Sequence, residues 1–169
     1  NEPCVVVDAK TFQYLDTIGG LALPRFFLPL DNNTAYISQW GSDGLTGSVA
    51  KVNLNTNQIE KTIPTGQGPE KMVRVNDRVY IANSGGYGKD STLTEILLSN
   101  DAPQILALPA GTNPSSLVWN NYQSSAKLYY LCKGHYLDLV QKGWLDNLSS
   151  TGQGLEAPVY SDDLVLDDF

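Results

Sequence analysis

The sequence predicts an all-β chain assembled from a four-stranded unit that recurs about every 45 residues. The first observation is the spacing, because a fixed period of roughly 20 to 50 residues is typical of repeat architectures. Three aliphatic residues lie 45 positions apart, and a proline follows each of them six positions later: Ile18, Ile63 and Leu108, then Pro24, Pro69 and Pro114. The second observation is the local pattern, because short runs rich in β-branched and aromatic residues alternate with turns containing Gly, Asn and Asp. A helical period of 3.6 residues is missing from these units, which argues against helical repeats.

Each unit has the pattern of two joined β-hairpins. In the second unit, KMVRV leads through the turn VND into RVYIANS, and upstream VAKVNL leads through NTN into QIEKTI. Four antiparallel strands in about 45 residues are typical of one blade of a β-propeller. We therefore expect a β-propeller rather than a β-sandwich or a β-solenoid, with the three repeated prolines at the start of the innermost strands.

The repeat boundaries predict one domain over residues 1–169 that forms part of a ring. The expected blades span about 24–63, 69–108 and 114–150, and half-blades lie at 2–18 and 156–168. The C-terminal half-blade depends on TGQGLEAPVYSDDLVL, which resembles TGQGPEKMVRVNDRVY found 86 residues earlier. Three possibilities remain open: the half-blades pair with each other, the chain belongs to a longer ring, or it assembles with a second chain.

Composition narrows the classes of partner and the chemistry. The net charge of −7 disfavours nucleic acid and anionic membrane surfaces, and no apolar stretch is long enough for a membrane helix. The two cysteines, Cys4 and Cys132, lie in separate strand-like runs without a CxxC pair, so we expect buried thiols rather than a disulfide. With one histidine, His135, the chain has no zinc ligand set, and we predict neither a resident metal nor a cofactor.

A ligand site is expected on one rim of the propeller. Loops that join the fourth strand to the next blade, and loops that join the second strand to the third, open on the same face. Glycines and prolines in these loops serve turns, but aromatic and charged residues there suit a polar ligand. We predict that five of them bind it: Arg25, Trp40, Glu70, Lys71 and Tyr87. By contrast, Tyr36, Tyr80 and Tyr129 recur in the second strand, and we expect them to pack between blades.

Catalysis is not expected from these residues. No serine or cysteine motif accompanies His135, so a nucleophile activated by this histidine is not indicated. A hydrolase would need Asp43, Glu70 and Asp90 to converge on the channel around calcium, and their spacing is not diagnostic of such a site. We predict that the chain is not an enzyme.

Several segments together resemble a known family. VVDAKTFQYLDTI, LPRFF, NTAYISQWG and GSVAKVNLNTNQIEKTIPTGQGPEKM are similar to the YncE-like, YVTN-type propellers of Bacteroidetes surface proteins, and the resemblance covers residues 2 to about 134. It implies a seven-bladed lipoprotein on the outer membrane, and its BtuG-type branch implies capture of corrinoids for a transporter. The sequence departs from the family where Cys4 falls inside a strand, aligned with Val49, and cannot be the lipidated anchor.

Together these features predict a binding protein, and the family resemblance implies that it is extracellular or at the cell surface. Its expected partner is a small polar ligand, with a corrinoid as one candidate, or an outer-membrane protein. The alternative is a protein-binding or structural surface-layer module.

Overall fold

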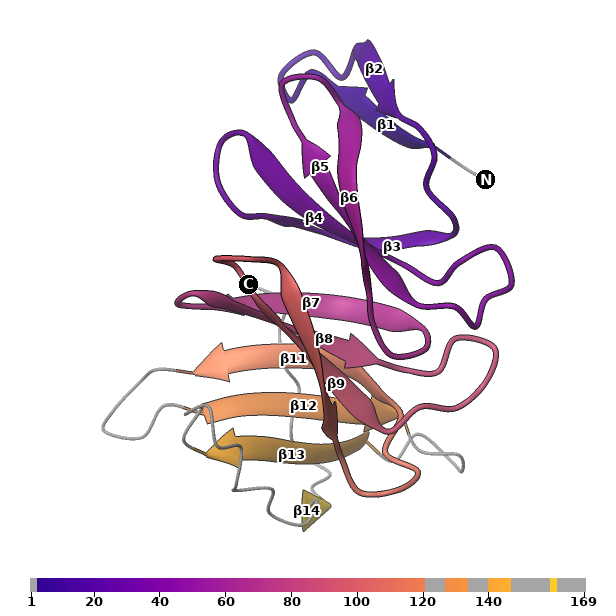
Figure 1. Cartoon of the computed structure of the whole chain (residues 1–169), viewed down its shortest axis with the longest axis vertical. Coiled ribbons are helices and arrows are strands. Elements are labelled where there is room, and N and C mark those ends of the chain that lie inside the picture. The colour runs from indigo at the N-terminus through magenta and orange to yellow at the C-terminus, as the bar shows by residue number, and fades with distance from the viewer. Residues whose placement is uncertain (1–2, 121–126, 134–139, 147–158, 161–169) are drawn as a thin grey trace.

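The computed structural model describes residues 3–120, 127–133, 140–146 and 159–160, and these residues are all-β (Figure 1). They contain fourteen strands in four antiparallel sheets, and no helix occurs among them. The expected all-β class is confirmed. Parts of the expected segments 114–150 and 156–168, together with His135, lie outside the described residues.

Two sheets reproduce the two best-conserved repeats of the sequence pattern. The first contains β3 (Pro24–Pro29), β4 (Thr34–Gln39), β5 (Ser48–Asn53) and β6 (Gln58–Pro64). The second contains β7 (Pro69–Val75), β8 (Arg78–Asn83), β9 (Thr92–Leu97) and β10 (Ala102–Ala107). In both sheets each strand pairs with the next along the chain, as expected for units 24–63 and 69–108.

The third sheet differs from the expected division. It contains β11 (Pro114–Asn120), β12 (Lys127–Lys133), β13 (Val140–Asp146) and β14 (Val159–Tyr160). The short strand β14 pairs with β13, although the sequence pattern placed its residues in a separate half-blade at 156–168. Without β14 the outer edge of β13 would have unpaired backbone N–H and C=O groups, and the pairing satisfies some of them. Sequence similarity to TGQGPEKM therefore identified a strand here but not its partner.

The N-terminal hairpin is formed by β1 (Cys4–Val7) and β2 (Tyr14–Ile18). Its register matches β5–β6 residue for residue: Cys4 pairs with Ile18 as Val49 pairs with Ile63, and both ladders shift at the equivalent position. The hairpin expected over 2–18 is thus present. Its two strands form a sheet of their own, so within the described residues it does not pair with β14.

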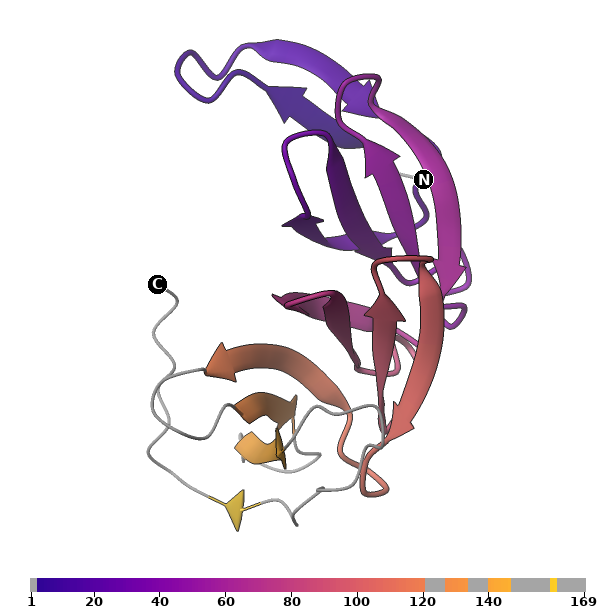
Figure 2. The ribbon, with the colours of Figure 1, turned by 60° about the vertical axis from the view of Figure 1, so that its left-hand side comes forward.

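The repeated prolines place three strands side by side. Pro24, Pro69 and Pro114 begin β3, β7 and β11, and β7 contacts both of the others. Figure 2 shows the sheets following one another along an open arc, with β1 and β2 at one end and β13 and β14 at the other.

The core is divided into three apolar clusters, each between consecutive sheets. Between the N-terminal hairpin and the first four-stranded sheet lie Ile18, Leu21, Ile37, Ala50 and Val52. Between the first and second sheets lie Tyr36, Val49, Ile63, Met72, Val79, Ile81 and Ile96. Between the second and third sheets lie Tyr80, Leu93, Leu117, Leu128 and Tyr130, among others. Since each large apolar side chain contributes roughly 1.5–3 kcal/mol when buried, sheet-to-sheet packing holds the arc together.

The repeated tyrosines follow this division. Tyr36 and Tyr80 are fully buried between sheets, as the sequence predicted. Tyr129 pairs across to Val118 as Tyr80 pairs to Val73, but it is only partly buried because no further sheet covers it within the described residues.

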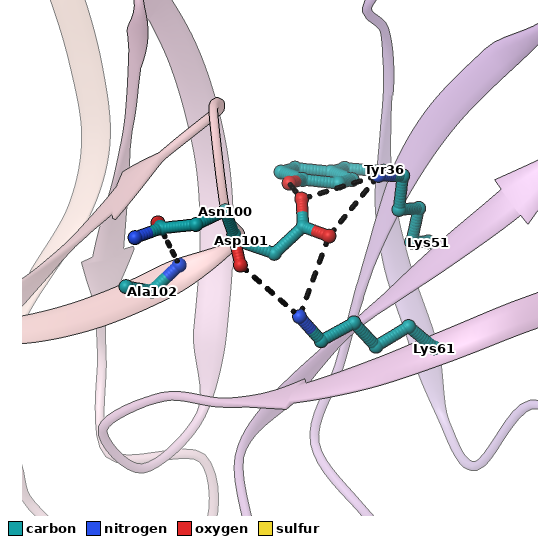
Figure 3. Close-up of polar contacts among 6 residues, drawn as sticks. All are labelled: Tyr36, Lys51, Lys61, Asn100, Asp101 and Ala102. Atoms are coloured by element: carbon teal, nitrogen blue, oxygen red, sulfur yellow. Dashed lines mark hydrogen bonds and ion pairs between the residues drawn. The ribbon is translucent and has the colours of Figure 1, made fainter.

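A polar cluster also joins the first and second sheets (Figure 3). The Asp101 carboxylate lies in the β9–β10 turn and accepts a 2.6 Å hydrogen bond from the Tyr36 hydroxyl. Lys51 and Lys61 donate to the same carboxylate at 3.1 and 3.4 Å. Burial acts to raise the pKa of Asp101, but the Tyr36 and Lys51 hydrogen bonds outweigh it and leave the pKa lowered.

The two thiols are free. Cys4 is partly buried in β1 and Cys132 is buried in β12, which agrees with the expectation of unpaired thiols. Burial raises the pKa of the Cys132 thiol to about 12, so this side chain is protonated and unreactive at neutral pH.

Candidate functional site

Four of the five predicted ligand residues lie together at one junction of the first two sheets. Arg25 follows Pro24 in β3, and Glu70 follows Pro69 in β7, so the two occupy equivalent positions 45 residues apart. Trp40 directly follows β4, and Tyr87 lies in the loop between β8 and β9. The repeat therefore explains why these residues meet, since β3 and β7 are adjacent.

An ion pair bridges the two sheets. Arg25 Nε donates to Glu70 Oε2 at 3.3 Å, from an exposed guanidinium to a buried carboxylate. Burial raises the pKa of Glu70, and Arg25 opposes that rise without cancelling it. The Trp40 indole N–H also acts to lower the pKa of Glu70, although its geometry is not that of a hydrogen bond. The indole nitrogen is buried and makes no hydrogen bond to any group that the structure describes. A buried indole N–H therefore lies next to the ion pair without an acceptor among the described groups.

The aromatic residues continue from this ion pair. The Arg25 guanidinium carbon lies 4.5 Å from the centre of the Trp40 ring, which is a cation–π distance. The Tyr87 ring meets Trp40 edge to face, with centroids 5.5 Å apart and an angle of 84°. Arg25 therefore covers part of Trp40, whereas Tyr87 is 73% exposed and can stack on a ligand.

Loop packing fixes the position of Tyr87. Its amide donates to the Gly44 carbonyl at 3.1 Å, and a side chain at Gly44 would collide with the Tyr87 ring. Gly44 has a φ of +69°, so both its backbone conformation and this contact favour glycine.

Asp43 orders the first of these loops. Its carboxylate accepts hydrogen bonds from the Thr46 hydroxyl and from the amides of Leu45 and Thr46, and these bonds lower its pKa to about 2. Asp43 therefore supports the loop conformation.

Two adjoining hollows share Arg25 and Trp40. The smaller has a volume of about 170 Å³ and includes Tyr87 in its wall. The larger, about 620 Å³, is open and draws residues from all three four-stranded sheets and the loops next to them. Its lining is Arg25, Phe26, Trp40, Glu70, Ser84, Gly86, Gly88, Lys89, Asn113 and Ser115. Lys71 lines neither hollow.

Sequence reasoning did not select several lining residues. Ser115 follows Pro114 just as Arg25 and Glu70 follow their prolines, and Ser84 follows β8 as Trp40 follows β4. The 45-residue offset applied to Arg25 would have found Ser115, whereas Ser84 lies 44 residues after Trp40 and is found only when the ends of β4 and β8 are aligned. Lys89 and Asn113 carry no such signal, because the equivalent segments have the same lengths but a different composition: Leu45 stands at the position of Lys89, and Leu23 and Gly68 stand at that of Asn113.

The carboxylates considered for calcium serve separate roles. Glu70 pairs with Arg25, Asp43 caps its own loop, and Asp90 accepts a 2.6 Å hydrogen bond from the Gln67 amide. Among the described residues, no three His, Cys, Asp or Glu side chains are grouped closely enough to hold a metal ion.

Comparison with known proteins adds no functional assignment. The sequence matches no family model and has no significant similarity to a curated protein. The likeness to YncE-like propellers therefore stays a prediction. In the part of the chain that the structure describes, no helix has the length and apolar character needed to cross a bilayer.

Proposed function

We propose that the chain is a segment of a β-propeller, with its four-stranded sheets as blades. Three features support this arrangement: the sheets recur with the sequence period, apolar cores lie between consecutive sheets, and β7 contacts both β3 and β11. Adjacent first strands are expected around a propeller axis.

We propose further that it is a non-enzymatic binding protein that captures a small polar ligand at the larger hollow. The observation that carries this is the convergence of Arg25, Trp40 and Glu70 with Lys89 and Asn113 on one concavity of about 620 Å³. That volume is in the range of sites for small molecules, and its lining combines aromatic faces with a few polar groups. Tyr87 stands at the rim with most of its ring exposed.

The side chains indicate which ligand chemistry fits. Glu70 is already paired with Arg25, so Lys89 leaves the hollow with a surplus positive charge. The Ser115 hydroxyl adds hydrogen-bonding capacity, whereas the Asn113 amide and the Ser84 hydroxyl already bond backbone groups of the surrounding loops and retain only part of theirs. A ligand with a flat or corrugated surface plus amide or phosphate groups would use both sets, and a corrinoid has those features. Placement outside the cell rests on the family resemblance alone.

The alternative proposal is a protein-binding or structural surface module. It is favoured by the N-terminal hairpin, whose outward apolar side chains Val5, Phe12 and Tyr14 are exposed. Such exposed apolar patches mark protein interaction sites.

A thermal-shift screen tests the ligand proposal. The probes are cobalamin, cobinamide, nucleotides, sugar phosphates and calcium, each added to the 169-residue chain. A ligand present at 100 times its Kd stabilises the folded state by about 2.7 kcal/mol, which gives a readily measured rise in Tm. A rise that is lost in Lys89→Ala, with no loss in Lys10→Ala, supports binding at the hollow. If no organic probe raises Tm, the small-ligand proposal fails and the surface module remains.

A further inference from the structure

One face of the N-terminal hairpin lacks the cover that its equivalents have elsewhere in the chain. Val5 and Val7 occupy the positions of Ala50 and Val52, 45 residues later and in the same ladder register. Ala50 and Val52 are fully buried because they pack on the preceding hairpin. Val5 is 60% exposed and Val7 is 44% exposed. The hairpin thus presents an apolar surface of the kind that joins one unit to the unit before it.

The turn of the N-terminal hairpin also lacks the contact with a preceding unit that the equivalent turns make. Phe12, Asn57 and Asp101 sit at the same point of the three hairpin turns, all with φ near +55°. At the first two junctions between sheets this residue reaches back to the preceding unit: Asn57 donates to Asp16 at 2.7 Å, and Asp101 accepts from Lys61. Phe12 is 78% exposed. A positive φ is costly for an aromatic residue, so Phe12 is an unfavourable choice for a merely solvated turn.

The opposite end of the arc has the complementary surface. In β12, Leu128, Tyr130 and Cys132 pack toward the second sheet, so the alternate residues Tyr129 and Leu131 face away from it. Tyr129 corresponds to Tyr80 in register, and Tyr80 is fully buried by the next sheet. Tyr129 and Leu131 are only partly buried. This face is therefore of the kind that receives the next unit.

We infer that these two surfaces bind each other between two copies of the chain, head to tail. The outward face of β1–β2, with Val5, Val7 and Phe12, packs on the face of β11–β12 that carries Tyr129 and Leu131. The second copy is the occupant because it offers the surface that each internal junction already uses. The contact is heterologous, so it closes a ring if the rotation permits and otherwise extends a chain. The inference does not depend on a ligand at the hollow.

Sedimentation velocity over a dilution series of the 169-residue chain tests the inference. The unmodified chain is expected to form a dimer or larger species whose fraction rises with concentration. Val5→Asp should weaken association about tenfold or more, because it places a charge in an apolar contact. Phe12→Asn should weaken it too while the Tm holds or rises, since Asn tolerates a positive φ. Ile105→Asp is the matched control, because Ile105 is an apolar β-branched residue on β10 that is 50% exposed, close to the 60% of Val5, and lies away from both surfaces.

Mixing two variants tests the head-to-tail geometry. Val5→Asp blocks one surface and Tyr129→Asp blocks the other, so each variant alone should be monomeric. Their mixture retains one intact surface of each kind and should form 1:1 pairs. Circular dichroism melting verifies that Tyr129→Asp is folded, and Tyr129→Ser replaces it if it is not. A monomeric unmodified chain at every concentration overturns the inference, as does association that survives Val5→Asp or a mixture that stays monomeric.

Discussion

The first and second four-stranded sheets are joined by two polar clusters of opposite character. At the β9–β10 turn, Asp101 is enclosed by Tyr36, Lys51 and Lys61, and every one of these groups is paired. At the other junction, the Arg25–Glu70 pair lies beside a hollow, and the Trp40 indole nitrogen next to it has no hydrogen bond among the described residues. In the Asp101 cluster every polar group has a partner, so the cluster serves to stabilise the fold. The Arg25–Glu70 cluster lies beside a concavity and does not use all its polar groups, so it can also bind a ligand.

The largest expected effect comes from the saturated cluster. Asp101→Ala should lower the free energy of unfolding by about 2–3 kcal/mol, because it leaves the Tyr36 hydroxyl and Lys51 without their acceptor, removes one of two acceptors of Lys61 and forces Ala to a positive φ. Asp101→Asn keeps a residue that tolerates this φ and should cost less, about 1–2 kcal/mol. Urea unfolding followed by circular dichroism measures both.

Asp77→Ala is the control for that experiment. Asp77 is 68% exposed and lies 3.9 Å from Arg78, so its loss should cost less than about 0.5 kcal/mol. An equal cost for Asp101→Ala and Asp77→Ala would mean that the Asp101 cluster does not join the two sheets.

The second expected effect separates the two aromatic residues of the hollow. Tyr87→Ala should cost about 1–3 kcal/mol of binding to any probe that raises Tm, with a change in stability of less than about 1 kcal/mol, because its ring is mostly exposed. Trp40→Ala should lower both, since Trp40 also supports Arg25 and Tyr87. Titration calorimetry and thermal melting of the same two variants measure the two quantities. A loss confined to stability in both variants would assign them to packing.

Sequence reasoning predicted the repeating hairpins well because proline, glycine and aromatic positions recur with a fixed offset. It placed Arg25, Trp40, Glu70 and Tyr87 on one face, and the structure brings them around two adjoining hollows because equivalent segments of successive units lie next to each other. It could not foresee that Arg25 covers Trp40, which depends on the rotamer of a long side chain. Lys71 was included because the segment PTGQGPEK was assigned to the rim, but it lines neither hollow, and the register of β7 shifts between Pro69 and Met72. The sequence also could not predict that β14 pairs with β13, because a strand of two residues is too short to show an alternating pattern.

The smallest expected effect is a difference in sign between the carboxylates of Glu70, which is buried, and Asp101, which is partly buried, as pH changes. The pKa of Glu70 is raised in the folded protein, chiefly by burial, so folding favours its protonated form. Its ionisation therefore reduces stability as pH rises from the ordinary pKa of 4.5 through the folded value. The pKa of Asp101 is lowered despite its burial, because Tyr36 and Lys51 bind the ionised form. Its contribution is present above the ordinary pKa of 3.8 and is lost as pH falls through the lower folded value.

Urea unfolding from pH 3 to 7 should show Glu70→Gln gaining stability relative to the unmodified chain as pH rises, and Asp101→Asn losing stability relative to it. Two difference curves with the same slope would show that Arg25 stabilises the ionised form of Glu70 as fully as Tyr36 and Lys51 stabilise that of Asp101. The contrast between the two clusters would then fail.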